Sequence, residues 1–498
     1  MKESLRAMAP SRRALVVSGW AVLVFSPFAL LLLIGLLTGC NAFAARPVWP
    51  DELSYWRGLF AWNQMGFEGG LNGLYEQAAR YGILGTDGLS PIVLYGWFVK
   101  LFGLSEASIL LGNAVWVSLG ALVCCALLRP SPGASLSLAA LFALFPPVIL
   151  YVTTSMTEVF GYALALMYAP LLIRTVQTGK GRYAALLLAL VTLAALHRAL
   201  YALLALPVLA AYAHGRPGRL RVALCALAAL GLSAGCMAAC FFLEAPNPQG
   251  FVHHLLQQKD FSMFLSMLFS HAKANVLEYF TRPATFMEAA LRLTYLCVAA
   301  VCLVGAFTAR RRKKGARVDA ELLGCFGLLT AAWGLTLTFY EVGDWVDYRM
   351  LSPFLWLTLA YLLLRRRVVL PRAALAAGAI TLAVMLSQPA TGAFADPNRF
   401  TPAPEDPALS QAISAVVYDA QAENPLTNTV RTDVSTLQVM RELDPGLGLQ
   451  FGWFTTDTTG QSAWILTDRL KCAVNGYERV ADTGGYKVYR LIESYEEE

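Results

Sequence analysis

The sequence predicts a polytopic α-helical membrane protein with about 11 crossings, followed by a small α/β domain outside the membrane. Of the 498 residues, 57% are hydrophobic and only 14% are charged, and the mean hydropathy is +0.53. Soluble domains average roughly 25% charged residues. The net charge of +6 does not indicate nucleic acid, because the basic residues cluster in short loops between apolar runs, where they set topology.

The expected crossings follow from apolar runs of up to ~20 residues and from the basic clusters that border them. The first run is longer than the ~7–15 residue apolar core of a signal peptide, so we expect a retained helix with a cytoplasmic N-terminus. This alternation places the C-terminus outside, on the extracytoplasmic side of the membrane. The crossings are 14–37, 107–128, 136–152, 159–173, two within 183–212, 222–243, 289–308, 322–340, 350–364 and 373–386.

The run 183–212 is about 30 residues long and is basic on both flanks, which puts both of its ends in the cytoplasm. His197 and Arg198 interrupt it near the middle. We therefore expect two short crossings that meet outside at this pair. The alternative is one long tilted helix with a buried polar pair, which would break the charge alternation downstream.

Two long loops, 39–105 and 244–287, lie on the outer side in this arrangement. Within the first, the segment 90–103 begins with Ser90-Pro91 and ends at Gly103, which predicts a short interfacial helix. From about residue 389 no spanning run remains, and prolines become frequent. The expected elements of the C-terminal domain are strands at 429–432 and 463–466, a helix at 434–443 and a hairpin at 480–491 around Gly484-Gly485.

Adjacent carboxylates, Asp51 and Glu52, follow the first apolar run among Trp49, Tyr55 and Trp56. Acidic residues near a membrane surface are costly unless they have a task or a partner. The structural alternative is a polar loop start behind an aromatic belt. The turn 151–158 brings a third carboxylate, Glu158, to the same side.

Several motifs, taken in order, resemble the bacterial membrane glycosyltransferases of the GT-C fold, including the lipid A aminoarabinose transferases and the protein O-mannosyltransferases. The resemblance covers about residues 14–390. Its motifs are Pro50-Asp51-Glu52 with Tyr55-Trp56, Ser90-Pro91 with Lys100-Leu101-Phe102-Gly103, Thr154-Ser155-Met156-Thr157-Glu158, His197-Arg198, and Tyr348-Arg349 with Pro353.

The resemblance implies a transmembrane glycosyltransferase domain over 1–388 and a soluble extracytoplasmic domain over 389–498. Such enzymes pass a sugar from a polyprenyl-phosphate carrier to an extracytoplasmic acceptor, usually with inversion. Asp51 falls on the catalytic acidic position, Glu52 on its neighbour and Glu158 on the second acidic position. The sequence departs from the pattern in lacking a Lys or His at Ser90 and a proline after Arg198.

The chemistry of such a transfer agrees with these residue types. Nucleotide sugars are not expected outside the plasma membrane, so the donor must be carried on lipid. The acceptor hydroxyl needs a general base, for which Asp51 is the candidate. The departing phosphate leaves negative charge, which arginine stabilises with forked hydrogen bonds. The candidates for phosphate binding are Arg349, Arg198 and Arg57, and those for lining the substrate cavity are Tyr55, His197 and Tyr348.

Each of these arginines has an alternative interpretation as a residue that reaches from a helix end to the membrane surface. No residue set defines a metal site: some relatives use a divalent metal ion, but His253 and His254 are more typical of a loop. Cys40 and Cys472, which lie outside the apolar runs, could pair only in an oxidising compartment. Two other classes stay open: a lipid-linked sugar flippase or transporter, and a non-catalytic membrane scaffold.

Overall fold

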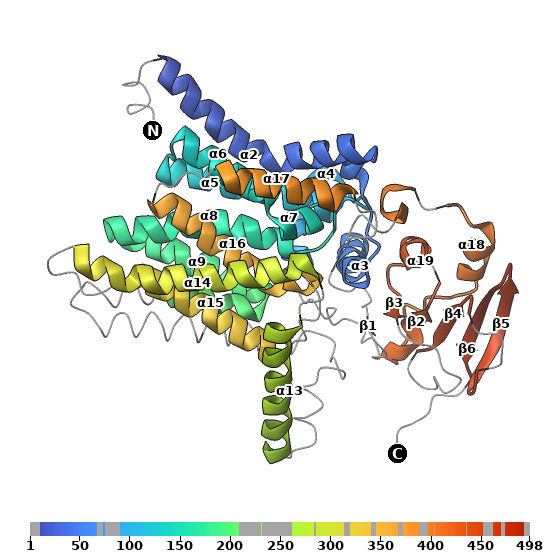
Figure 1. The fold of residues 1–498 in the computed structure, drawn as a ribbon. Helices are drawn as coiled ribbons and strands as arrows, with labels where there is room; N and C mark the ends of the chain where they lie inside the picture. The colour runs from blue at the N-terminus through green and yellow to red at the C-terminus, as the bar shows by residue number, and fades with distance from the viewer. Residues whose placement is uncertain are drawn as a thin grey trace.

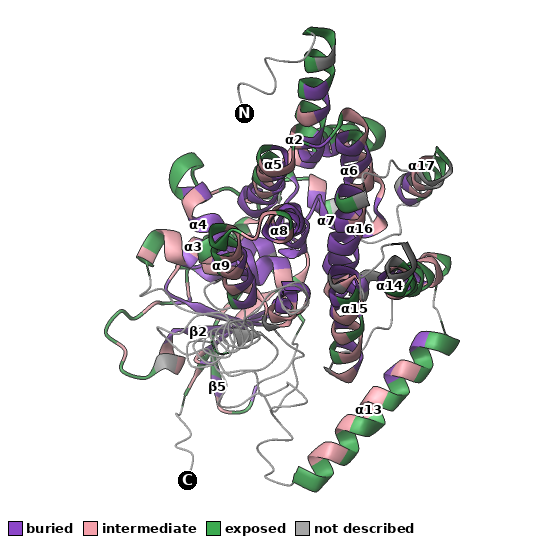
Figure 2. Ribbon diagram, turned by 90° about the vertical axis from the view of Figure 1, so that its left-hand side faces the viewer, coloured by how far each residue is buried: buried purple, intermediate pink, exposed green. Residues whose placement is uncertain are grey.

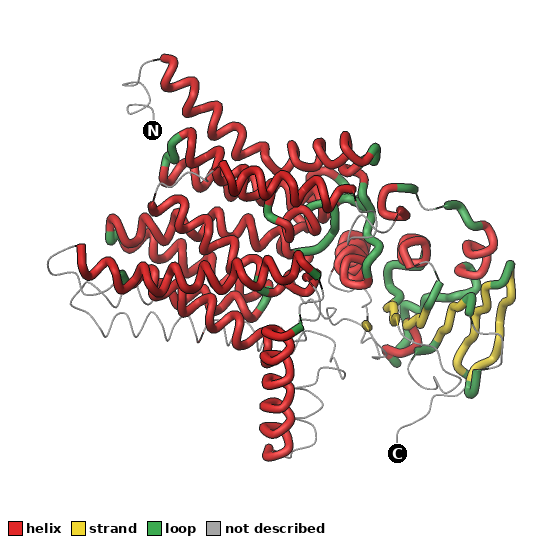
Figure 3. The backbone as a smooth tube through the Cα atoms, viewed as in Figure 1, coloured by secondary structure: helices red, strands yellow, loops and turns green. Residues whose placement is uncertain are grey.

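The computed structural model describes residues 10–66, 73–74, 90–208, 231, 261–282, 285–312, 319–339, 345–366, 372–387, 397–402, 404–434, 436–451, 462–469 and 474–492. These residues form a helical bundle with a β-sheet at one of its ends (Figures 1 and 3). Helix α3 (Pro50–Met65) lies between the bundle and the sheet. The adjacent carboxylates Asp51 and Glu52 are in the first turn of this helix.

Within the described residues, five helices are long and apolar enough to cross a membrane. They are α2 (Pro10–Thr38), α5 (Ser108–Leu128), α8 (Glu158–Thr178), α14 (Phe286–Arg312) and α15 (Ala320–Phe339). Shorter helices complete the bundle: α4 (Ser90–Phe102), α6 (Pro132–Leu144), α7 (Pro146–Tyr151), α9 (Gly181–His197), α16 (Ser352–Arg366) and α17 (Arg372–Ser387).

Most of the predicted helices have a counterpart in the structure, although the count of about 11 crossings stays a prediction. The expected crossing 136–152 is divided into α6 and α7, because Pro146 and Pro147 cannot continue the first helix. The expected break in 183–212 is present: α9 ends at His197 and the 3₁₀ helix η3 (Ala199–Leu204) follows Arg198. Except for residue 231, the expected crossing 222–243 lies outside the described residues.

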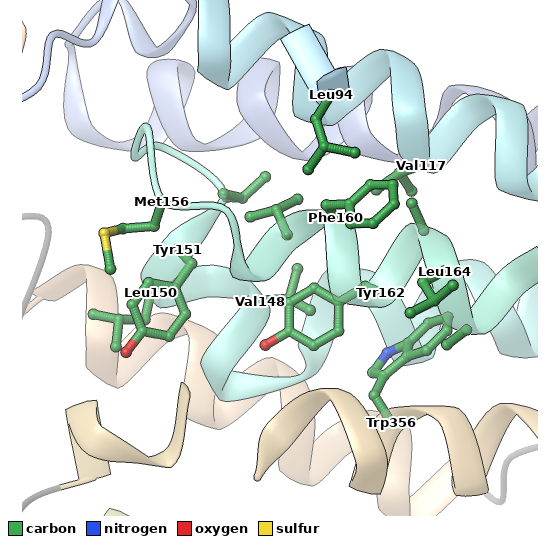
Figure 4. Close-up of a cluster of buried hydrophobic side chains, with 14 of the residues drawn as sticks. Leu94, Val117, Val148, Leu150, Tyr151, Met156, Phe160, Tyr162, Leu164 and Trp356 are labelled. Carbon is green, nitrogen blue, oxygen red and sulfur yellow. The ribbon is translucent and has the colours of Figure 1, made fainter. Parts of the chain in front are cut away.

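Helix α8 is the centre of the bundle, and nearly all of its residues are buried (Figure 2). Helices α5, α9 and α16 pack against it. Gly120 of α5 permits a close approach, since a Cβ atom there would lie 2.7 Å from the carbonyl oxygen of Ala163. Figure 4 shows the apolar contacts around α8, which join Phe160, Tyr162 and Leu164 to Leu94, Val117, Val148 and Trp356.

Helix α13 (Phe261–Thr281) differs from the other long helices. It lies across the direction of the bundle helices in both Figure 1 and Figure 2, and it is not one of the five spanning candidates. Asn275 and Tyr279 form its buried side, and the Asn275 amide donates a hydrogen bond to the carbonyl oxygen of Leu337 in α15 at 2.8 Å. Leu277 and Phe280 are exposed.

The C-terminal residues form most of a six-stranded sheet of order β1-β3-β2-β4-β6-β5. The first four strands in this order are parallel, and β6 pairs antiparallel with β4 and β5. Helices α18 (Pro407–Ile413) and α19 (Thr436–Glu442) accompany the sheet. The strands are β1 (Gly73–Leu74), β2 (Thr429–Thr432), β3 (Gly448–Phe451), β4 (Trp464–Thr467), β5 (Tyr477–Thr483) and β6 (Tyr486–Leu491).

The sheet contains both predicted and unexpected strands. Strand β2 has the predicted bounds, and the hairpin turns at Gly484 and Gly485, whose φ angles of +58° and +99° suit a two-residue hairpin turn. Strand β3 was not predicted. Strand β1 was not predicted either, and it comes from the first long loop, so that loop adds a strand to the C-terminal sheet.

The expected membrane orientation can be tested with thiol labelling. Gln411 lies in α18 and Arg182 near the start of α9, and both are exposed. In intact cells, Gln411→Cys should react with a membrane-impermeant thiol reagent and Arg182→Cys should not, each compared with the parent protein. Labelling in the reverse pattern would invert the arrangement.

Candidate active site

Asp51 and Arg349 form an ion pair at the end of the bundle that faces the sheet. Asp51 lies in the first turn of α3, where the helix N-terminus favours negative charge. Arg349 lies in the 3₁₀ helix η4 (Trp345–Met350), and its Nη1 is 2.5 Å from Oδ2 of Asp51. The side chains of Arg349 and Asp51 remain 34% and 29% exposed. A ligand can therefore reach both partners.

A second ion pair joins Glu158, the first residue of α8, to Arg198, which follows α9. Arg198 Nη2 lies 2.6 Å from Glu158 Oε1, and the Glu158 side chain is fully buried while Arg198 is 22% exposed. The same nitrogen lies 3.4 Å from the Tyr55 hydroxyl and 3.4 Å from Thr157 Oγ1. Tyr55 thus connects α3 to this pair.

The two ion pairs are close to each other. Arg198 Nη1 lies 3.4 Å from the sulfur of Met350, the residue that follows Arg349. Burial alone would lower the pKa of Arg349, but the Glu158 and Asp51 carboxylates outweigh that effect and raise it. The site therefore combines a partly exposed carboxylate with two arginines, which can accept a proton and hold an anion at one place.

Glu52 lies apart from this group, and its expected place beside Asp51 in catalysis stays a prediction. Its carboxylate is fully buried and accepts forked hydrogen bonds from Nη1 and Nη2 of Arg399, both at 2.8 Å. It also accepts backbone N–H bonds from Val48, Trp49 and Ser155. Both oxygens of Glu52 are therefore engaged inside the protein.

Arg57 is also placed differently from the expected phosphate site. Its side chain is buried, and its guanidinium donates hydrogen bonds to carbonyl oxygens at and beyond the C-terminal end of α19. A cation is favourable there because the last carbonyls of a helix lack partners within it. Arg57 therefore joins α3 to the C-terminal domain. The acceptors are the carbonyls of Met440, Leu443, Asp444 and Leu447.

The three residues expected to line a cavity have different surroundings. Tyr55 contacts Arg198, as described above. The ring of His197 packs against Phe160 and Tyr201, with ring centroids 5.5 and 5.9 Å apart. The Tyr348 hydroxyl donates a hydrogen bond to the Tyr279 hydroxyl at 2.8 Å. Tyr348 is fully buried, and this hydrogen bond joins α13 to the residue before Arg349.

Arg399 is the residue that the sequence reasoning missed. It lies in the 3₁₀ helix η6 (Pro397–Phe400), after the last bundle helix, where no local pattern distinguishes it. The cost of placing Glu52 near a membrane implied that a partner exists. The sequence does not show which residue is the partner of Glu52, because Arg399 is 347 residues away.

The described residues offer no metal site, since they contain no group of three or more His, Cys, Asp and Glu that could hold an ion. The carboxylates of Asp51 and Glu158 each face an arginine instead. Because these residues do not fit a divalent ion, we derive no step through a metal. His253, His254 and Cys472 lie outside the described residues.

Residues 91–242 match the family described as dolichyl-phosphate-mannose-protein mannosyltransferase. The match confirms the resemblance drawn from the motifs, over less than half of the chain. It includes Glu158, His197 and Arg198 but stops short of Asp51 and Arg349.

No curated protein matches the chain. Among solved structures, the chain is similar to the cryo-EM structure of the arabinofuranosyltransferase AftD from mycobacteria, with 15% sequence identity and a TM-score of 0.44. The alignment covers 97% of this chain and 42% of that one, so the chain spans less than half the length of AftD.

The role of Arg57 gives a prediction about stability. Arg57→Met leaves buried carbonyls at the end of α19 without their donor, and we expect it to destabilise the protein by roughly 3 kcal/mol. The measurement is the thermal unfolding midpoint in detergent. The matched control is Arg441→Ala, which removes an exposed arginine 3.7 Å from Glu106 and should change stability by less than about 1 kcal/mol. Equal effects of the two substitutions would contradict the assignment.

Proposed function

We propose that this chain is a membrane glycosyltransferase that moves a hexosyl or pentosyl group from a polyprenyl-phosphate carrier to an extracytoplasmic acceptor, a cell-envelope glycan, lipid or protein. The observation that carries the proposal is the partly exposed Asp51–Arg349 pair beside the buried Glu158–Arg198 pair. The match of residues 91–242 to a mannosyltransferase family supports the same reaction class.

The surroundings of Arg349 support a donor carried on lipid. A polyprenyl phosphate has an apolar chain and an anionic head, so it is best held where an arginine lies beside lipid-facing apolar surface. The Tyr348–Tyr279 hydrogen bond fixes α13 next to Arg349. The exposed side chains of Leu277 and Phe280 on α13, with Leu293 on α14, provide apolar surface of this kind.

The reaction assigns one task to each pair. The acceptor hydroxyl oxygen forms a bond to the anomeric carbon while the bond from that carbon to the phosphate oxygen breaks, and the configuration inverts. The phosphate leaves with the bonding electrons, and Arg349 and Arg198 stabilise its charge. Asp51 accepts the proton from the hydroxyl.

The ion pair also sets an order of events. When the donor phosphate binds Arg349, it competes with Asp51 for the guanidinium. Asp51 is then released from the ion pair as the donor arrives, and its carboxylate can accept a hydrogen bond from the acceptor hydroxyl.

Asp51→Asn tests the role of the base. We expect transfer to fall by roughly 10²–10⁴-fold, because an amide cannot accept the proton. Donor affinity should not fall, since the competing carboxylate is gone. The measurements are transfer from radiolabelled polyprenyl-phosphate sugars to membrane extracts, and donor binding. Near-normal turnover would remove Asp51 from this role, and absence of transfer by the unmodified protein would favour a flippase or a scaffold.

Arg349→Lys tests the phosphate site. Lysine keeps the charge but loses the planar fork, so we expect donor affinity to fall about tenfold, or about 1.4 kcal/mol, and further in Arg349→Ala. The measurement is donor binding at matched amounts of folded protein. Arg198→Ala serves as the comparison: if it weakens binding while Arg349→Ala does not, the phosphate lies at Arg198.

A further inference from the structure

We infer that Arg399 is a positioning residue of the proposed active site: acting through Glu52, it fixes Asp51 and Glu158 relative to each other. The inference rests on the proposed function of those two carboxylates. Arg399 itself touches neither of them. Its task follows from what Glu52 connects.

The Glu52–Arg399 pair is directional and sealed from solvent. Two hydrogen bonds of 2.8 Å join the two guanidinium nitrogens to the two carboxylate oxygens, and both side chains are completely buried. The face of the guanidinium lies over the ring of Trp49, with its carbon 4.9 Å from the ring centroid. A forked pair held in this way fixes orientation as well as charge.

The same carboxylate ties together both acidic segments. Glu52 is the neighbour of Asp51 in α3, and its Oε1 accepts the backbone N–H of Ser155 at 2.6 Å. Ser155 lies in the turn that leads into α8 and Glu158. Arg399 Nη1 reaches this turn as well, at 3.5 Å from the carbonyl oxygen of Thr153. A shift of Glu52 would therefore move both acidic segments.

The segment that carries Arg399 is itself fixed to the chain just before α3. The backbone N–H of Arg46 donates to the carbonyl oxygen of Arg399 at 2.9 Å, and Arg46 Nε donates to that of Asn398 at 2.5 Å. Arg399 thus cannot follow a displaced Glu52 without breaking these bonds. The Glu52–Arg399 pair and the hydrogen bonds from Arg46 form one junction, which holds the start of α3 in a fixed position.

Stability alone does not explain this arrangement. A buried ion pair is often no more stabilising than well-packed apolar residues, because both charges lose their hydration. The two parallel hydrogen bonds of the Glu52–Arg399 pair also fix the orientation of the two side chains. In catalysis, a misplacement of about 1 Å can cost roughly 10²-fold in rate. The effect of changing Arg399 should therefore appear in turnover and not in donor affinity.

The experiment compares Arg399→Lys and Arg399→Gln with Arg441→Ala, an exposed arginine that also links the C-terminal domain to the bundle end. We expect both Arg399 variants to lose at least about tenfold in kcat per folded molecule. Donor Kd should stay within about twofold, since Arg349 and Arg198 are unchanged. Arg441→Ala should behave as the unmodified protein. Glu52→Gln should resemble Arg399→Gln in kcat. The double variant should have a kcat no lower than that of either single variant, because both substitutions break the same Glu52–Arg399 pair.

A second readout does not depend on activity. Amide hydrogen exchange of residues 153–157 should accelerate in Arg399→Gln and Glu52→Gln, because the Ser155 N–H loses its fixed acceptor, and should not change in Arg441→Ala. Unchanged exchange, or unchanged kcat per folded molecule, would overturn the inference, as would a loss confined to donor affinity. If Arg399→Gln does not fold, the kcat and exchange measurements on Arg399→Lys and Glu52→Gln test the inference. If the unmodified protein transfers no sugar, the proposed function fails while the exchange measurement still tests the junction.

Discussion

A carboxylate at the edge of an apolar helical bundle needs a cation, and this constraint organises the site end of the molecule. Each of three carboxylates there has its own arginine, and the arginines come from separate parts of the chain. Neutralising the carboxylates therefore requires that the late bundle segments and the C-terminal segment reach the same place as the first loop. The pairs are Asp51–Arg349, Glu52–Arg399 and Glu158–Arg198.

Differences in exposure divide the tasks among these pairs. A completely buried pair such as Glu52–Arg399 can neither exchange a proton with a substrate nor give up its arginine without leaving a buried charge unpaired. The Asp51–Arg349 pair is partly exposed, so an incoming anion can take its arginine at lower cost. In the proposed mechanism the sealed pair has a structural role and the partly exposed pair a chemical one, although the two carboxylates are neighbours in the sequence.

The sequence reveals features that depend on local periodicity and not those that depend on distant pairing. Apolar runs and basic flanks predicted α5, α8 and the break after His197, and the Gly484-Gly485 pair predicted the hairpin. The position of Arg399, the addition of β1 to the sheet and the burial of Arg57 follow from contacts over hundreds of residues. The difference between Asp51 and Glu52 had a local cause: a glutamate three positions after an N-cap reaches back to the N-cap N–H, here that of Trp49, and so turns inward.

The C-terminal domain then has a defined relation to the site. It contacts α3 at two places: Arg399 binds Glu52 in the first turn of the helix, and Arg57 of α3, one to two turns later, binds carbonyl oxygens at the end of α19. Its sheet also includes β1, from the loop that follows α3. A helix held along its length from one side keeps a fixed orientation relative to the bundle on its other side. Because Asp51 comes from α3 and Arg349 and Glu158 come from the bundle, the geometry between them depends on this hold. The domain is therefore part of the framework of the proposed active site, even though its own side chains do not reach Asp51 or Glu158 among the described contacts.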